Sequence, residues 1–344
     1  MSTPFRRTVR VVYPVGAGRI VLRTADDWDA DVEARRVSDD RHAWEFDLTG
    51  ETSVLEYKPC LVGDGVFAWA SGANKLALLG NSGVQEVYPW FDPFGAAYIT
   101  PSLSFESEIL GRELALRVYL PAGHRENYLK RYPVLYMHDG RNAFFPEEAF
   151  LHREWQVDET LDLLTRMSVI DELIVVALYT PYRMPDYVSP GYVAFSRAMV
   201  EELKPVVDAT FPTLTGPRDT AVLGSSLGGV AAFQLAWTYP EIYGQAACFS
   251  STFWYENDLI DRVRCEPLGA RSSLRLYLDS GWPNDNYEVT LSMVNTLIDR
   301  GFDPGVGVHH FAFPQSSHDE TSWGARLHLP IQLFFGRFTR RAGN

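Results

Sequence analysis

One short segment, residues 224–228, constrains the fold of this chain more than any other. It reads Gly-Ser-Ser-Leu-Gly and stands between an apolar run at 220–223 and a helix-like segment at 229–236. A serine with glycine two residues before and two after it, between a strand and a helix, is typical of the nucleophile elbow. That turn is so tight that the flanking positions, here Gly224 and Gly228, must be almost free of side chain. The segment therefore predicts an α/β fold with a nucleophilic serine at a strand end.

Two adjacent serines compete for the position of the nucleophile. Ser226 has glycine at both flanking positions, whereas Ser225 would need glycine in place of Leu223 and Leu227. Ser226 is therefore the predicted nucleophile. A serine hydroxyl reacts slowly near neutral pH unless a base removes its proton, and the base needs a third group that fixes its tautomer. In an elbow-type hydrolase these groups follow one another in the order serine, acid, histidine.

Four histidines follow the serine in the chain. His309 and His310 lie inside the last expected strand, where consecutive side chains alternate between faces. His328 lies within the final helical pattern. His318 stands between that strand and that helix, in a loop at the carboxyl end of the strand, where α/β sheets carry their functional residues. His318 is therefore the predicted base.

The acid is expected just after the strand that ends at Leu278. Asp279 closes this strand, and Asp285 stands in the loop that follows it. A loop residue reaches a histidine on a neighbouring loop more easily, so Asp285 is the preferred acid. Asp279 is the alternative, since it could equally hydrogen-bond the backbone and shape the turn, and Glu288 ranks third.

A tetrahedral intermediate with an anionic oxygen needs hydrogen-bond donors that form an oxyanion hole. The first predicted donor is the backbone N–H of Leu227, at the start of a helix whose dipole favours negative charge. The second is expected from the loop at 138–142, where Gly140 opens the turn and the N–H of Arg141 or a neighbour is the candidate. His138 precedes the serine and is expected to order this loop rather than to act as a base.

Composition excludes several classes of protein. A net charge of −13 argues against non-specific binding of nucleic acid, which requires a basic surface. The chain has no run of about eighteen apolar residues, so no membrane span is expected, and no apolar stretch follows the basic start to make a secretory signal. The three cysteines, Cys60, Cys248 and Cys265, are far apart and odd in number, which favours a reducing compartment, the cytoplasm, over a disulfide framework or a metal site. No cofactor is expected.

The two parts of the chain have different patterns. Residues 1–90 contain short, partly alternating segments between Gly, Asp, Asn and Ser clusters, which predicts a small antiparallel β-sandwich domain. Residues 91–102 are expected to link this domain to the rest. From 103 to 344 strands and helices alternate, and the later strands are continuous apolar runs. This pattern predicts a mostly parallel eight-stranded sheet with helices on both faces.

Several motifs spread over residues 103–338 resemble those of the putative-esterase family, which includes enterochelin esterases, feruloyl esterases, S-formylglutathione hydrolase and mycolyl transferases. The resemblance implies an α/β-hydrolase fold and a triad of Ser226, Asp285 and His318. The β-rich first part is similar to the Ig-like domain that precedes the hydrolase domain in members of the enterochelin-esterase type. The segments that carry the resemblance are 117–121, 131–145, 155–159, 224–229, 278–281 and 317–323.

These inferences lead to one preferred function and two alternatives. The preferred function is that of a serine carboxylic-ester hydrolase, similar to enterochelin esterase, which works through an acyl-enzyme intermediate. The first alternative is acyl transfer by the same triad, because only the second nucleophile differs. The second alternative is a binding protein without activity on the same fold. The expected partner is a small-molecule ester, with no nucleic acid and no membrane, and association of identical copies is left open.

Overall fold

The structure is a computed structural model that describes residues 5–63 and 65–337. The chain forms two compact units, which are described separately. The first comprises Met1–Tyr98, Pro121–Arg131 and Thr165–Val169, and the second comprises the remaining residues. No helix in the part of the chain that the structure describes has the length and apolar character to cross a lipid bilayer.

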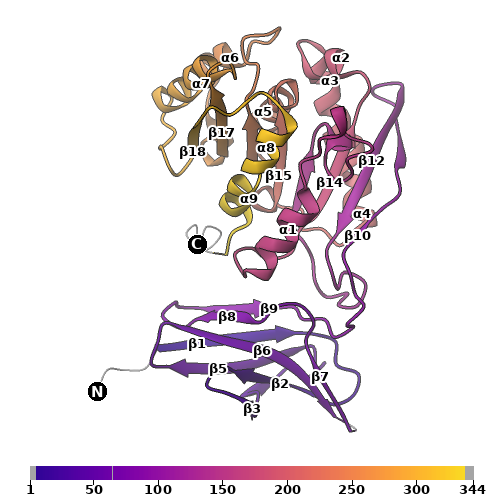
Figure 1. Cartoon of the computed structure of the whole chain (residues 1–344), viewed down its shortest axis with the longest axis vertical. Coiled ribbons are helices and arrows are strands. Elements are labelled where there is room, and N and C mark those ends of the chain that lie inside the picture. Colours follow the sequence, from indigo (N-terminus) through magenta and orange to yellow (C-terminus); the bar gives the residue numbers. More distant parts are fainter. Residues whose placement is uncertain (1–4, 64, 338–344) are drawn as a thin grey trace. The chain divides into compact units, whose positions relative to one another are not determined.

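The first unit is β-rich, as predicted. One sheet has the strand order β4-β5-β1-β9, and the other has the order β3-β2-β6-β7, with β8 also paired to β6 (Figure 1). The predicted antiparallel pattern holds for most pairs, but β1 and β9 are parallel, with Val11 opposite Val87. The strands are β1 (Phe5–Val12), β2 (Arg19–Thr24), β3 (Asp27–Val32), β4 (Arg36–Val37), β5 (Ala43–Gly50), β6 (Val54–Gly63), β7 (Val66–Trp69), β8 (Lys75–Leu78) and β9 (Val84–Val87).

The two sheets of the first unit share one apolar core. Alternate residues of the longer strands point into it, including Val9 of β1, Phe46 of β5, Leu22 of β2 and Tyr57 of β6. All four side chains are completely buried. Because strand side chains alternate between faces, apolar residues recur at every second position along parts of these strands.

The sheet of the second unit differs from the prediction of a mostly parallel eight-stranded sheet. It has nine strands and is mixed, with the order β10-β12-β14-β13-β15-β16-β17-β18 and β11 paired to β12. Strands β13 to β18 run parallel, whereas β12 is antiparallel to both β11 and β14. The strand missed by the prediction, β10, is only two residues long and therefore has no periodic pattern. The strands are β10 (Tyr98–Ile99), β11 (Leu103–Ser107), β12 (Arg112–Leu120), β13 (Val134–Met137), β14 (Ile174–Tyr179), β15 (Thr220–Ser225), β16 (Gln245–Phe249), β17 (Arg275–Trp282) and β18 (Val308–Pro314).

Helices connect the strands of the second unit and cover both faces of its sheet (Figure 1). On one face, Val222 and Cys248 pack with Phe233 of α5 and Met293 of α7. On the other face, the ring of Phe249 lies 5.3 Å from that of Trp155. The helices are α1 (Val157–Arg166), α2 (Arg183–Tyr187), α3 (Gly191–Arg197), α4 (Lys204–Thr210), α5 (Leu227–Thr238), α6 (Leu259–Cys265), α7 (Tyr287–Asp299), α8 (Glu320–Arg326) and α9 (His328–Phe335).

The turn from β15 to α5 is possible only because its glycines lack side chains. A Cβ atom at Gly224 would lie 2.3 Å from the carbonyl oxygen of Gly228, and one at Gly229 would lie 2.1 Å from Oγ of Ser251. The first clash is with backbone, which cannot rotate away. The elbow predicted from the sequence is therefore a close approach of two backbone segments.

His138 directly follows β13, and its side chain is buried. Its ring lies 5.3 Å from that of Tyr187 and 5.6 Å from that of Phe195, and within the described chain neither ring nitrogen has a hydrogen-bond partner. Burial, aided by the charge of Arg183, lowers the pKa of His138 to about 3. The sequence led us to expect that His138 orders the following loop. In the structure its ring packs in an aromatic cluster and makes no hydrogen bond to the described residues of that loop.

Substitution of Gly224 by alanine should destabilise the second unit. The new methyl group would overlap the backbone of Gly228, and overpacking of this kind typically costs about 1–3 kcal/mol. Chemical denaturation would measure the change in the free energy of unfolding. Gly16→Ala is the control, because no atom lies within 4 Å of the added carbon. Equal stability of the two variants would contradict this description of the elbow.

Substitution of His138 by phenylalanine should make the protein less sensitive to acid. The unfolded chain binds a proton at this histidine below about pH 6.5, whereas the folded protein binds it only near pH 3, so stability falls as the pH falls through this window. Between pH 6.5 and 5 the free energy of unfolding of the wild type should fall by about 2 kcal/mol more than that of His138→Phe. Urea denaturation at both pH values measures this difference. The exposed-site variant His328→Gln should behave like the wild type, and an identical pH dependence for His138→Phe would refute the argument.

Candidate active site

Ser226 occupies the strained position of the elbow. Its backbone has φ 55° and ψ −120°, outside the regions that residues with side chains ordinarily adopt. It directly precedes α5, and its side chain is half-buried. Ser225, by contrast, is the last residue of β15 and is buried. The structure therefore presents only the second of the two serines at the turn.

Backbone hydrogen bonds hold the elbow against the next strand. The N–H of Ser226 donates to the carbonyl of Phe249 at 2.9 Å, and its carbonyl accepts from the N–H of Thr252 at 3.3 Å. One residue along, the N–H of Ser250 donates to the carbonyl of Asp279 at 2.8 Å. Since β15, β16 and β17 are parallel neighbours, these bonds lie at their shared carboxyl edge. Residues 249–252 thus connect the serine turn to the end of β17.

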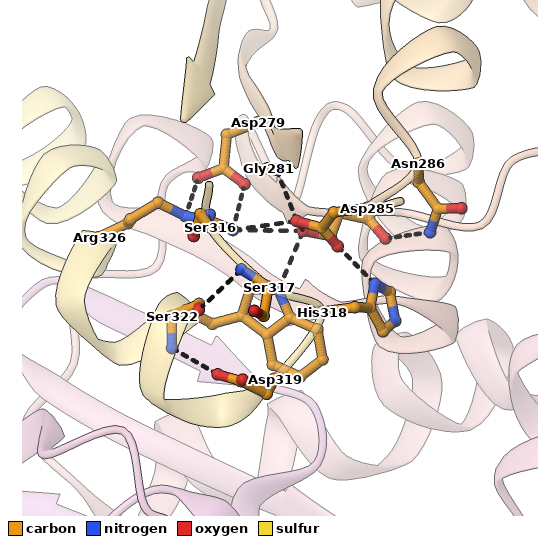
Figure 2. Close-up of polar contacts among 12 residues, drawn as sticks. Asp279, Gly281, Asp285, Asn286, Ser316, Ser317, His318, Asp319, Ser322 and Arg326 are labelled. Carbon is orange, nitrogen blue, oxygen red and sulfur yellow. Dashed lines mark hydrogen bonds and ion pairs between the residues drawn. The ribbon is translucent and has the colours of Figure 1, made fainter. Parts of the chain in front are cut away.

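His318 and Asp285 are hydrogen-bonded to each other, as Figure 2 shows. The distance from Nδ1 of His318 to Oδ1 of Asp285 is 2.6 Å. His318 lies between β18 and α8, and its side chain is 34 % exposed, whereas that of Asp285 is completely buried. The ring of Trp323 stands edge-on to the imidazole, with centroids 4.9 Å apart. The carboxylate and this ring together fix the orientation of the imidazole.

The second oxygen of Asp285 is also hydrogen-bonded. Oδ2 accepts from the N–H of Gly281 at 2.5 Å and from the hydroxyl of Ser250 at 2.7 Å. A Cβ atom at Gly281 would lie 2.7 Å from Oδ2 and 2.1 Å from the carbonyl oxygen of Ser316. The glycine in the segment 278–281 therefore makes room for the carboxylate at the strand end.

Asp279, the alternative acid, faces a different partner. Its Oδ2 lies 3.1 Å from Nε of Arg326 and accepts from the hydroxyl of Tyr277 at 2.7 Å. Burial raises the pKa of Asp279 to about 7, although Arg326 and Tyr277 act in the opposite direction. The carboxylate that is hydrogen-bonded to His318 therefore belongs to Asp285 and not to Asp279.

The loop after β13 lies against the elbow. Asp139 has φ 55°, and residues Gly140–Asn142 form a 3₁₀ turn. A Cβ atom at Gly228 would lie 2.8 Å from Oδ2 of Asp139, so this loop touches the first turn of α5. Arg183 donates twice to Asp139, at 2.6 and 2.9 Å, and so compensates its charge. The two segments predicted to supply oxyanion donors therefore lie in contact.

The other candidate residues have structural contacts. The Arg141 side chain donates to the carbonyl of Glu148 at 2.8 Å, and the oxyanion donor expected from the sequence is its backbone N–H. His309 lies near the carbonyl of Val306, and His328 near that of Ala325. Glu288, the third acid candidate, is in the first turn of α7.

Sequence reasoning missed Ser250 and Arg326. Both side chains are buried. Ser250 donates a hydrogen bond to Asp285, and Arg326 donates one to Ser250. A signal for Arg326 was present, because it lies on the same helical face as Trp323 and Leu327, where an arginine needs a buried partner. Nothing in the sequence distinguishes Ser250 from its neighbour Ser251.

Most of the second unit matches a known protein family. The profile of the family described as "Putative esterase" matches residues 107–329. YbbA of Bacillus subtilis, an uncharacterized protein, is 24% identical over 147 residues, which cover 41% of this chain and 57% of YbbA. The chain thus spans little more than half the length of this curated relative.

Solved structures share the fold. A ferulic acid esterase superposes with a TM-score of 0.58 and 17% identity, covering 69% of this chain and 98% of the other. The enterobactin esterase FES from Shigella flexneri superposes with a TM-score of 0.57 and 15% identity, covering 96% of this chain and 93% of that protein. The family match, which takes in Ser226, Asp285 and His318, extends over more than half of the chain. The chain therefore belongs to the putative esterase family, as the sequence motifs predicted.

Proposed function

We propose that the protein is a serine carboxylic-ester hydrolase in which Ser226, His318 and Asp285 form a catalytic triad. The observation that carries the proposal is the 2.6 Å bond from His318 to a buried carboxylate at the same sheet edge as the strained Ser226 turn. Residues 249 and 250 bond to Ser226 on one side and to Asp285 on the other. Strained backbone such as that of Ser226 clusters at active sites, which favours a functional role for this arrangement.

In the proposed reaction, Oγ of Ser226 attacks the ester carbonyl carbon while its proton passes to Nε2 of His318. The imidazolium so formed is stabilised by Asp285, which accepts the Nδ1 proton in a hydrogen bond without taking it. Collapse of the intermediate breaks the bond to the alcohol oxygen, which receives the proton from His318. Water then repeats the sequence on the acyl-enzyme and releases the acid.

The intermediate's oxygen needs donors, and we place them on two backbone segments. The N–H of Leu227 opens the twelve-residue helix α5, where unpaired N–H groups and the helix dipole favour a negative charge. The turn at Gly140–Asn142 is the second candidate, through the N–H of Arg141 or a neighbour. The contact between Asp139 and the first turn of α5 supports this pairing.

For the substrate, we propose an ester of an aromatic acid. One fold neighbour is named for the aromatic acid ferulic acid. Trp254 is 65% exposed, and its Nε1–H donates to Oδ1 of Asn286, the residue after Asp285, at 2.9 Å. An indole whose polar edge is bonded presents a flat apolar face to solvent, which suits stacking on an aromatic ring.

A cytoplasmic location is part of the proposal. All three cysteines are free in the structure, and Cys60 and Cys248 are buried. Proteins of oxidising compartments use disulfides for stability, so unpaired cysteines favour a reducing compartment.

Substitution of Ser226 by alanine should abolish ester hydrolysis while the protein stays folded. Loss of a triad member typically lowers turnover by about 10⁴- to 10⁶-fold. The measurement is a panel of acetyl, butyryl, feruloyl and catecholate esters, with circular dichroism as the folding control. Retention of more than about a tenth of the wild-type rate would refute the role of Ser226. Products formed with added alcohols would distinguish acyl transfer from hydrolysis.

The two acids should differ in their effect. Asp285→Asn should lower kcat by about 10⁴-fold, because an amide favours the wrong imidazole tautomer. Asp279→Asn should lower kcat by only about 10- to 100-fold, because Asp279 contacts Arg326 and not His318. Steady-state kinetics on the best ester of the panel would measure both effects. If Asp279→Asn lowered kcat more than Asp285→Asn, the acid of the triad would be Asp279.

A further inference from the structure

Ser250 lies at the centre of a buried polar cluster behind Asp285. Its side chain is completely buried at the carboxyl end of β16. Its hydroxyl oxygen lies 2.7 Å from Oδ2 of Asp285, 3.0 Å from Nε1 of Trp323 and 3.2 Å from Nη2 of Arg326. Three elements far apart in the sequence thus meet at one hydroxyl group.

The chemistry of these partners fixes the direction of the hydroxyl proton. The indole N–H of Trp323 and the guanidinium of Arg326 can only donate hydrogen bonds, so both use the oxygen of Ser250 as acceptor. The single hydroxyl proton must then point at the remaining partner, the carboxylate of Asp285. Two donors into one hydroxyl also polarise it and make it a stronger donor.

Arg326 is the only positive group in this cluster among the residues that the structure describes there, and it serves two carboxylates. Its Nε is 3.1 Å from Oδ2 of Asp279, and its Nη2 is 3.9 Å from Oδ2 of Asp285. Nη1 donates to the hydroxyl of Ser316, two residues before His318, at 2.7 Å. Its side chain is only 4% exposed, so its charge acts with little screening by water.

We propose that Ser250 and Arg326 are positioning residues, with Asp279 as the anchor of the arginine, that hold Asp285 in register with His318. The inference rests on the proposed function, but it concerns how the acid is held and not which group reacts. Asp285 has two oxygens, and only a carboxylate fixed through Oδ2 keeps Oδ1 aimed at the imidazole. Arg326 also holds the loop of His318 through its hydrogen bond to Ser316. One guanidinium therefore positions both Asp285 and His318.

The test compares Ser250→Ala with Ser280→Ala. Ser280 is a completely buried serine of β17 whose hydroxyl has no partner within the described chain, so its removal matches the loss of volume without the hydrogen bond. Ser250→Ala should lower kcat by about 10- to 100-fold with KM unchanged, the typical effect of losing a group that orients another. Arg326→Lys keeps the positive charge but loses the several N–H donors of the guanidinium. Its kcat should lie between those of Ser250→Ala and the wild type.

A second readout does not depend on activity. The proton on Nδ1 of His318 gives a low-field proton NMR signal when it is held in a short bond to a carboxylate. Ser250→Ala should shift or broaden this signal, and Ser280→Ala should leave it in place. An unchanged signal in Ser250→Ala, or equal kinetics of the two alanine variants, would overturn the proposal. If the wild type hydrolysed no ester of the panel, the proposed function would fail, and the NMR comparison alone would still uphold or overturn the positioning role.

Discussion

The Asp285 carboxylate is a charged group in a place that water does not reach, and much of the second unit is arranged around it. A buried carboxylate is tolerated only when both oxygens are hydrogen-bonded. Here the bonds come from Gly281, Ser250 and His318, on three separate segments. Satisfying this one charge therefore fixes how the ends of β16, β17 and β18 meet.

Close backbone approach is the second condition for this site. The elbow needs Gly224 against Gly228, and the acid needs Gly281 against the carbonyl of Ser316. In both places a side chain would push apart segments that carry functional groups. The glycines thus connect local backbone geometry to the placement of Ser226 and Asp285.

The parts of the site that local sequence determines were predictable. The G-x-S-x-G turn and the position of His318 after the last strand depend on neighbouring residues and chain order. The hydrogen bond of His318 to Asp285 agrees with the preference for Asp285 over Asp279 as the acid. The strand count was wrong by one, because β10 is too short to show a pattern. Ser250 was missed because its contacts span 35, 73 and 76 residues, and no spacing rule brings such distant positions together.

The central claim is that Ser226 is a nucleophile activated by the His318–Asp285 pair. Covalent labelling with a fluorophosphonate probe tests it most directly, because the probe reacts only with an activated serine. Fragmentation mass spectrometry of the labelled peptide, which contains both Ser225 and Ser226, locates the adduct. The account predicts one adduct, on Ser226, and its loss when His318 is replaced by alanine. An adduct on Ser225, or none on the folded protein, would contradict it.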